Sequence, residues 1–476
     1  MTKPVFTEGS ILRHIINMAV TGAIGLTALF FVDFLNMFFL SMLGQQELAA
    51  AVGFAGSILF FTIAICIGLS ISCGALVGKA LGASSPIEAK RFLVNNLVVA
   101  IILSSIIALI IFISIEPLLL LLGASGKTFS FAVSYLKIII PSMPILAAGM
   151  VLGAGIRAVG DPKLAMYVVL AGGLVNAIFD PILIFGAGLD IKGAAISSIL
   201  ARLTMLLCGV YGVFIKHKLY RRFTMANFKS HFQPIAQIAM PAIITNIATP
   251  FANAVIMAVL AGYGDNYIAG YAVIGRLMPV AFSLVFALSG AVGPIIAQNY
   301  GAGQFDRVKL VLSKSIIFST IYTLAICIIL MLAQGVIIAL FKASGEAKTI
   351  IAIFCNGFSL FFIFNGTLFI ANALFNNIGH PRFATMFNLG KATLGTIPFV
   401  YAGSYYGGVW GIWIGISLGG MFFGISSLYM AFKLVAKAEV LAQPDSLILA
   451  TTVNPLSSSC TQLGQVVEEI DGEGLS

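Results

Sequence analysis

Long apolar segments recur along this chain with only short polar breaks between them. A helix needs about 20 apolar residues to cross the hydrocarbon of a bilayer, and these segments reach that length. They are apolar on every side rather than in alternation, which excludes the strands of a membrane β-barrel. The segments predicted as twelve transmembrane helices are residues 15–43, 48–79, 92–117, 131–157, 164–186, 193–215, 233–262, 267–299, 311–341, 348–376, 383–406 and 409–436.

The small share of charged residues leads to the same fold class. Only 9% of the residues are charged and 60% are hydrophobic, whereas a soluble domain carries about 25% charged residues. A chain of 476 residues with so little charge cannot cover a soluble particle. We therefore predict an all-α integral membrane protein, present as a monomer and solvated by membrane lipid.

The net charge of +9 reflects topology rather than binding of nucleic acid. Lysine and arginine gather at the N-terminus, in the connections from even-numbered to odd-numbered helices and after the last helix. The opposite connections hold only Lys127, Lys192, Lys342 and Lys348. Positive charge is retained on the cytoplasmic side of a membrane. We expect a multi-pass protein of the inner or plasma membrane with both termini in the cytoplasm.

An internal repeat divides the chain. Residues 19–80 align with residues 239–300 at an offset of 220, and "GDPK" at 160–163 matches "GHPR" at 379–382. Six helices in each half make the repeats parallel, and transporters of this plan bind substrate between the halves. The predicted parts are an N-lobe (1–215), a cytoplasmic linker (216–232), a C-lobe (233–437) and a disordered acidic cytoplasmic tail (438–476).

Two carboxylates lie well inside apolar segments, Asp33 and Asp180. An ionised carboxylate at that depth needs a cation, a proton or a basic partner. At 1.5 Å per residue both lie roughly 25–30 Å from the inner surface, with Asn176 one turn from Asp180 and Ser198 at a similar level. Oxygen ligands suit Na⁺, and neighbouring carboxylates raise each other's proton affinity. The cluster is predicted to bind Na⁺ or H⁺; the alternative is that each Asp pairs with an intramembrane arginine.

The second half is different in charge. Asn253 stands where the offset places the equivalent of Asp33, and the predicted helices of this half contain no acid. Arg202, Arg276 and Lys391 are the basic residues expected to balance the acids or to line the cleft. The alternative for these three is snorkelling or local pairing.

Several motifs resemble the multidrug and toxic compound extrusion (MATE) family. They are "GALVGKALGA" (74–83), "GPIIAQNYGA" (293–302), "RLMPVAFSLVFALSGAVGP" (276–294), "RAVGDPK" (157–163) and "NAIFDPILIFGAGLDIKGAAISS" (176–198). The last is similar to the branch related to DNA-damage-inducible MATE proteins. The resemblance covers residues from about 10 to 436. It implies export of lipophilic, often cationic compounds in exchange for H⁺ or Na⁺, with the ion at Asp33, Asn176, Asp180 and Ser198.

Other functions fit the sequence less well. HExxH is absent, and the GxSxG match at 415–419 lies inside an apolar predicted helix rather than on a strand-to-helix turn, so an enzyme is not expected. The cysteines show no metal or redox spacing. No cofactor is expected apart from the coupling ion H⁺ or Na⁺. The leading hypothesis is a secondary antiporter that moves a small molecule by alternating access. The alternatives are a lipid-linked oligosaccharide flippase of the same superfamily and a channel.

Overall fold

The computed structural model describes residues 4–43, 46–341 and 343–442, which form helices joined by short turns. The first half contains α1 (Ile11–Met42), α2 (Gln46–Gly82), α3 (Pro86–Ile113), α4 (Ile115–Leu121), α5 (Gly126–Ile139), η1 (Ile140–Ser142), α6 (Met143–Val159), α7 (Pro162–Pro181), η2 (Ile182–Gly186), α8 (Asp190–Val210) and η3 (Tyr211–Lys216). The second half contains α9 (Met225–Ala261), α10 (Asp265–Ala281), α11 (Ser283–Gly301), α12 (Phe305–Leu340), α13 (Gly345–Asn356), η4 (Phe358–Phe361), α14 (Phe362–Asn377), α15 (Pro381–Ala392) and α16 (Ile397–Leu441).

The helices make twelve membrane spans. Within the described residues, ten helices are long and apolar enough to cross a membrane, and the pair α10 and α11, bent by 48°, adds one more span. The stretch Pro381–Leu441 is one of the ten, but it reverses at Gly408, where φ is 55° and ψ is −140°. A Cβ added to Gly419 would lie 2.6 Å from the carbonyl carbon of Gly395, so the two arms of this stretch pack closely against each other. Counted as two passes, it completes the predicted twelve helices.

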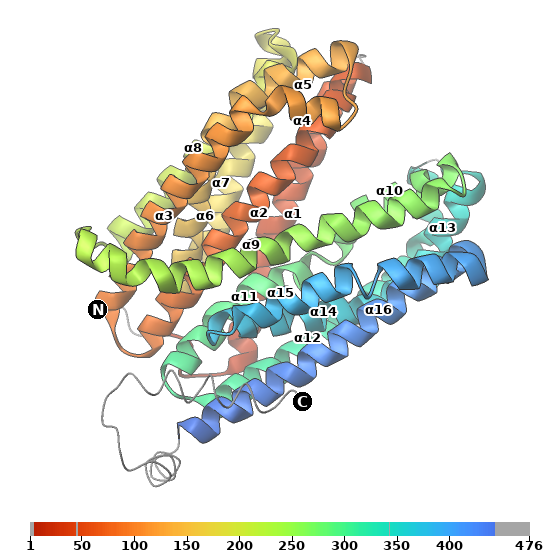
Figure 1. Cartoon of the computed structure of the whole chain (residues 1–476). Helices are drawn as coiled ribbons and strands as arrows, with labels where there is room; N and C mark the ends of the chain where they lie inside the picture. Colours follow the sequence, from red (N-terminus) through yellow and green to blue (C-terminus); the bar gives the residue numbers. More distant parts are fainter. Residues whose placement is uncertain (1–3, 44–45, 342, 443–476) are drawn as a thin grey trace. The chain divides into compact units, whose positions relative to one another are not determined.

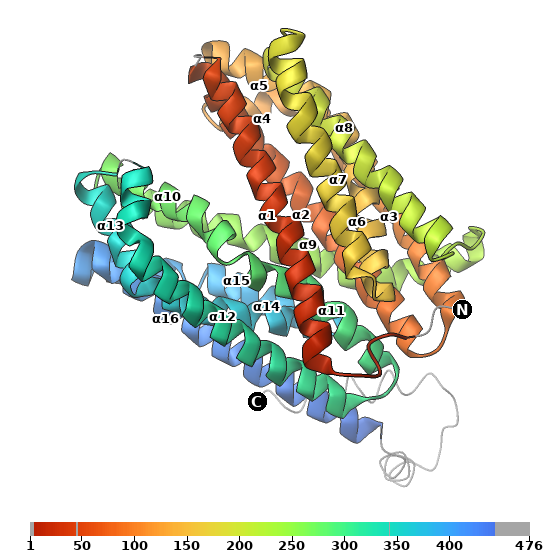
Figure 2. The same cartoon turned by 180° about the vertical axis from the view of Figure 1, so that it is seen from behind.

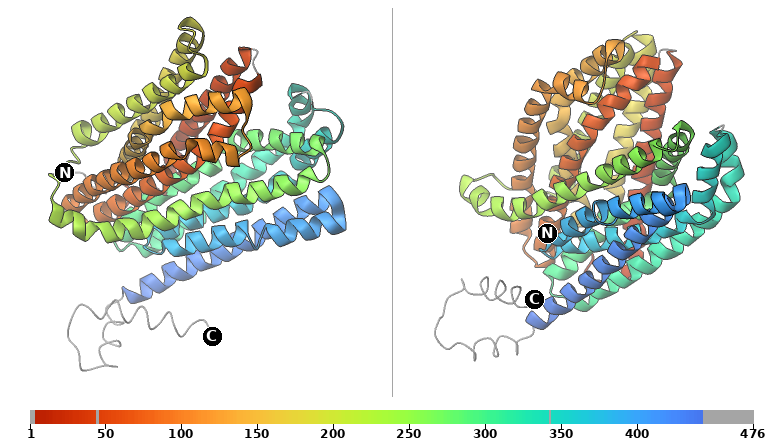
Figure 3. Two further views of the ribbon diagram at one scale, coloured as in Figure 1. Left: turned by 45° about the horizontal axis from the view of Figure 1, so that its top comes forward. Right: turned by 45° about the vertical axis from the view of Figure 1, so that its right-hand side comes forward.

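The spans are grouped into two bundles that correspond to the predicted repeats. We call α1 to α8 the N-bundle and α9 to α16, up to Phe432, the C-bundle; both belong to one compact unit (Figure 1). In the N-bundle α2 packs on α6 and α7 on α8, whereas in the C-bundle α9 packs on α15 and α11 on α14 (Figures 2 and 3). The bundles meet where α1 touches α11 and where α2 touches both α9 and α11.

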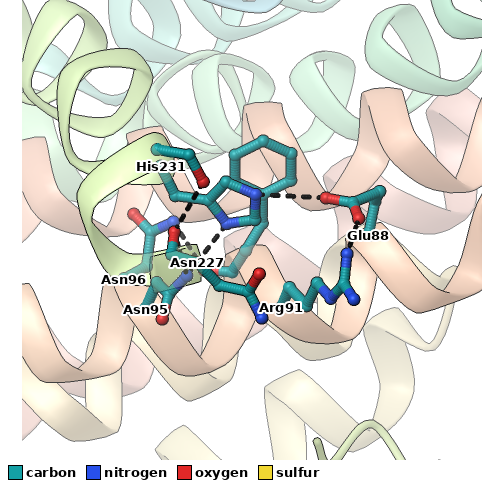
Figure 4. A network of polar contacts seen from close by, with 8 residues as sticks. Glu88, Arg91, Asn95, Asn96, Asn227 and His231 are labelled. Carbon is teal, nitrogen blue, oxygen red and sulfur yellow. Dashed lines mark hydrogen bonds and ion pairs between the residues drawn. The ribbon is translucent and has the colours of Figure 1, made fainter. Parts of the chain in front are cut away.

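The first helix of the C-bundle begins earlier than hydropathy predicts. It starts at Met225, inside the stretch 216–232 that was predicted as a linker. Figure 4 shows the reason: His231 of α9 lies 3.1 Å (Nε2) from Oε2 of Glu88, and its Nδ1 lies 2.9 Å from Nδ2 of Asn95, both on α3. The His231 ring also stacks on Phe92 at 4.1 Å. The first turns of α9 pack against α3 through polar contacts. The low hydropathy of these turns therefore does not indicate a loop.

The far end of the chain departs from the predicted parts in a similar way. The predicted C-lobe ends at residue 437 and the tail begins at 438, whereas α16 continues to Leu441. Residues from Lys433 onward belong to a second unit. The predicted tail from 443 to 476 lies outside the described residues.

Two glycine-containing ends of helices bring the bundles into close contact. A Cβ added to Gly82, at the end of α2, would lie 2.7 Å from the backbone carbon of Gln298 on α11. A Cβ added to Gly301, at the end of α11, would lie 3.0 Å from the carbonyl carbon of Lys79 on α2. Real Cβ atoms do not approach a backbone so closely, so glycine is required here. These glycines end the paired motifs "GALVGKALGA" and "GPIIAQNYGA".

The N-terminal segment reinforces the same contact. The N–H of Phe6 donates to Oε1 of Gln298 at 2.8 Å, and Nε2 of Gln298 donates to the carbonyl of Ala158 at 2.7 Å. Nδ2 of Asn299 and Nη2 of Arg307 donate to the carbonyl of Phe6 at 3.1 and 3.0 Å. Phe6, Gln298 and Asn299 are all buried. We call this junction of residues 4–9 with the ends of α2, α6 and α11 the closed end.

Candidate functional site

The centre of the candidate site is Asp180, near the end of α7. Its side chain is fully buried, and Nδ2 of Asn176, one turn earlier, donates to its Oδ2 at 3.3 Å. Its Oδ1 has no hydrogen-bond partner among the described residues. The helix continues beyond Pro181 as the π-helical turn η2, a feature that is frequent at functional sites. An unpartnered carboxylate oxygen in a buried position is able to take a proton or a small cation.

A hydroxyl group from α8 completes this cluster. Oγ of Ser197 donates to Oδ1 of Asn176 at 3.0 Å and to its backbone carbonyl at 3.2 Å. Ser197 also interacts with Asp180, and it is fully buried. The predicted hydroxyl, Ser198, is half-buried and lies near Tyr135 instead. Successive residues of a helix point about 100° apart, so the two serines face different neighbours.

The second predicted carboxylate, Asp33, lies on α1. Its neighbour Val32 packs against Gly173 of α7, where a Cβ added to the glycine would be 3.3 Å from the Val32 side chain. Asp33 itself is exposed on the protein surface, within the apolar span of α1, rather than buried. In the described part of the chain, no ion pair joins Asp33 or Asp180 to a basic residue.

Tyr135 on α5 connects the groups of this site, and the sequence analysis did not identify it. Besides lying near Ser198, the buried phenol is within electrostatic range of Arg202, Asp33 and Asp180. The available signal was a tyrosine five residues into a predicted helix that starts at the same membrane side as the Ser198 helix. Tyr135 therefore lies within electrostatic range of a carboxylate on α1 and of one on α7.

The basic residues that were predicted to balance the acids have other partners. Nη1 of Arg202 donates to Oγ of Ser142 at 2.7 Å and to the carbonyl of Ile139 at 3.3 Å. Lys391 of α15 donates to Oδ1 of Asn365 on α14. The structure therefore pairs Arg202 with groups of α5 and η1 rather than with the predicted acids.

The two remaining predicted residues also lie in the C-bundle. Arg276 is exposed on α10. Asn253 is exposed on α9, and its Oδ1 accepts a bond from the Tyr271 hydroxyl at 3.3 Å. The structure therefore brings together Asn176 and Asp180 with Ser197, and it leaves Arg276, Lys391 and Asn253 in the other bundle.

The chemistry of the site is that of hard oxygen ligands. Among the described residues, no three His, Cys, Asp or Glu side chains are grouped as a transition-metal site would require. Carboxylate, amide and hydroxyl oxygens of Asp180, Asn176 and Ser197 are suited to H⁺ or Na⁺. Twelve spans in two repeats, with a buried carboxylate, Asp180, in one of them, define the class: a two-repeat helical membrane transporter.

Comparison with known proteins identifies the family. The MatE family model matches residues 23–182 and 241–402, one match in each repeat. The chain is 30% identical over 429 residues to an FAD transporter of Shewanella oneidensis, covering 89% of this chain and 94% of the relative. It is 26% identical over 405 residues to the multidrug export protein MepA of Staphylococcus haemolyticus, covering 83% and 88%. The chain belongs to the MatE family and is a transporter rather than an enzyme.

Solved structures show the same fold. A MOP superfamily transporter from Pyrococcus furiosus superimposes with a TM-score of 0.86 at 21% identity, over 91% of this chain and 98% of that one. An outward-facing multidrug resistance MATE family transporter gives a TM-score of 0.86 at 20% identity, over 92% and 99%. The prediction of a MATE-like fold is therefore confirmed.

Proposed function

We propose that this transporter exports lipophilic organic compounds, including cations, in exchange for H⁺ or Na⁺ bound at Asp180 and Asp33. The observation that carries the proposal is the buried Asp180, whose Oδ1 lacks a partner among the described residues. A charged group in the interior of a bilayer costs about 2.5 kcal/mol or more. A proton or Na⁺ at this oxygen would offset that cost.

The position of α1 supports coupling between this site and the contact of the bundles. On one side, Val32 beside Asp33 packs against Gly173 of α7. On the other side, Gly22 of α1 packs against Ala287 of α11 in the C-bundle. Ion binding that draws Asp33 toward Asp180 therefore acts on a helix that touches both bundles. Rocking of one repeat against the other is the usual form of alternating access.

The orientation of the protein follows from its charges. We place the protein in the inner or plasma membrane with its basic connections in the cytoplasm. Both termini and the closed end then lie on the cytoplasmic side. The conformation described here would then admit ions and release cargo on the outer side. Relatives are named for multidrug export and for FAD transport, so a cargo with an aromatic or lipophilic body agrees with both.

The test is dye efflux from proteoliposomes under a pH gradient or a Na⁺ gradient, imposed one at a time. Asp180→Asn and Asp33→Asn should each lower ion-driven efflux of a cationic rhodamine by about tenfold or more, because a contact with a charged group contributes about 1.5–3 kcal/mol. Asp306→Asn is the matched control, since Asp306 is 87% exposed at the start of α12.

The assay distinguishes the coupling ion and tests the role of the two aspartates. Efflux driven by only one of the gradients identifies the coupling ion. If both intramembrane variants transport the dye at the rate of Asp306→Asn, the acids do not couple transport and the proposal is wrong.

A further inference from the structure

The C-bundle contains a lysine in the middle of the membrane. Lys391 follows Pro381, the first residue of α15, by ten positions, which places it about 15 Å along the helix. That is about half of the 30 Å hydrocarbon thickness. The described acidic residues of this bundle, Asp265, Asp306 and Glu346, all stand within the first two residues of a helix.

The partners of Lys391 are neutral. Its ammonium group donates to the amide oxygen of Asn365 on α14, and none of the ion pairs between described residues includes it. One turn earlier on α15, Nδ2 of Asn388 donates to Oδ1 of Asn372 on α14 at 2.9 Å. This is a second hydrogen bond between α14 and α15. A lysine ammonium has three donors, and an amide oxygen neutralises none of its charge. The charge of Lys391 is therefore available to an anion.

Burial along this polar row changes from one end to the other. Asn372 and Asn388 are buried, as is Asn376 one turn further along α14, whose Oδ1 has no partner among the described residues. In contrast, Lys391 and Asn365 are half-buried. The row therefore ends at a cationic and an amide group that are less buried than its other members.

A pair of aromatic rings lies one helical turn from Asn365. Phe369 is one turn from Asn365 on the same face of α14, and its ring centroid lies 5.4 Å from that of Phe286 on α11. Both rings are half-buried. The helices that carry the two rings, α11 and α14, each touch α2 of the N-bundle.

We propose that Lys391 and Asn365, beside Phe369 and Phe286, bind an oxyanion group, a carboxylate or a phosphate, carried by an aromatic cargo. Lysine binds such groups as a point charge, and the two rings supply the apolar surface for a planar body. The proposal rests on the proposed function, because it names a class of cargo for the same exporter. The two repeats then have different binding sites: carboxylates in the N-bundle bind the coupling ion, and a cationic side chain in the C-bundle binds the cargo.

The experiment compares two dyes with the same xanthene core, the anionic carboxyfluorescein and a cationic rhodamine. Proteoliposomes of neutral lipid are used with wild type, Lys391→Met, Lys391→Gln and Lys391→Arg. Glutamine keeps a donor for Asn365 without the charge, so it remains informative if methionine impairs folding. Lys127→Met, an exposed lysine at the start of α5, is the matched control.

We expect Lys391→Met and Lys391→Gln to lower carboxyfluorescein efflux by about tenfold or more, with rhodamine efflux within about twofold of wild type and Lys391→Arg close to wild type. An equal loss of both dyes in folded protein would assign Lys391 a structural role and overturn the proposal. Unchanged carboxyfluorescein efflux would also overturn it. If only added anionic lipid made efflux sensitive to Lys391, the occupant would be a lipid headgroup and not the cargo.

A binding measurement separates this inference from the proposed coupling mechanism. Fluorescence anisotropy of carboxyfluorescein with detergent-solubilised protein needs no ion gradient. Binding that weakens about tenfold in Lys391→Gln would support the anion site even if ion-driven efflux failed. Equal binding by wild type and Lys391→Gln would refute it even if Asp180 couples transport as proposed.

Discussion

Substitution of Gly82 by alanine should open the closed end. The added Cβ would lie 2.7 Å from both the backbone carbon and Cα of Gln298, whereas ordinary contacts begin at 3.4 Å. The helices α2 and α11 must therefore separate by about 0.7 Å or more. Overpacking of this kind costs about 1–3 kcal/mol, which lowers the population of the closed end about five- to 150-fold relative to an arrangement in which these helices are apart.

The assay is a distance measurement between spin labels on the two bundles. Ile87→Cys on α3 and Asp306→Cys on α12 place labels at exposed positions close in sequence to the contact, after the native cysteines are replaced. Gly82→Ala should shift the distance distribution toward longer values in lipid. Gly56→Ala is the matched control, because it lies on the same helix and its added Cβ meets no atom within 4 Å.

Two outcomes would refute the reasoning. One is a distribution for Gly82→Ala that matches wild type, which would mean that the contact yields at no cost. The other is an equal shift in Gly56→Ala, which would trace the effect to helix propensity rather than to the contact of α2 with α11.

Three further predictions concern the sites at either end of the bundles. Ser197→Ala should impair ion-driven efflux more than Ser198→Ala. It removes the hydroxyl that donates to the buried amide oxygen of Asn176, and an unsatisfied buried acceptor costs about 1–3 kcal/mol. The two variants are compared in the same proteoliposome assay. Burial raises the pKa of Asp161 but hydrogen bonds from Lys216, the N–H of Leu164 and His217 outweigh it, so its pKa lies below the ordinary value. Asp161 therefore stabilises the fold above about pH 4, and the deficit in Tm of Asp161→Asn should vanish as the pH falls through the native pKa; a deficit independent of pH would contradict this. Gln298→Leu removes the acceptor of Phe6, and it should expose the N-terminal segment to limited proteolysis, whereas unchanged cleavage would show that the segment is held by other contacts.

The sequence alone was sufficient for the class, the number of helices and the repeat. Apolar length and the bias of basic residues act through the bilayer, a solvent that constrains every segment separately. The same reasoning singled out Asp33 and Asp180, because a carboxylate in an apolar segment is unusual whatever its neighbours are. A local pattern is enough for such conclusions.

Tertiary structure decided the contacts between helices. The choice of Ser197 over Ser198 depends on the rotation of α8, and one residue changes that direction by about 100°. The place of Tyr135 depends on α5 and α8, which are apart in sequence, and the pairing of Lys391 with Asn365 depends on how the consecutive helices α14 and α15 pack. The early start of α9 depends on His231 reaching Glu88 across the two bundles. Hydropathy measures how a residue interacts with the bilayer, whereas these features depend on which side chains the packed helices bring together.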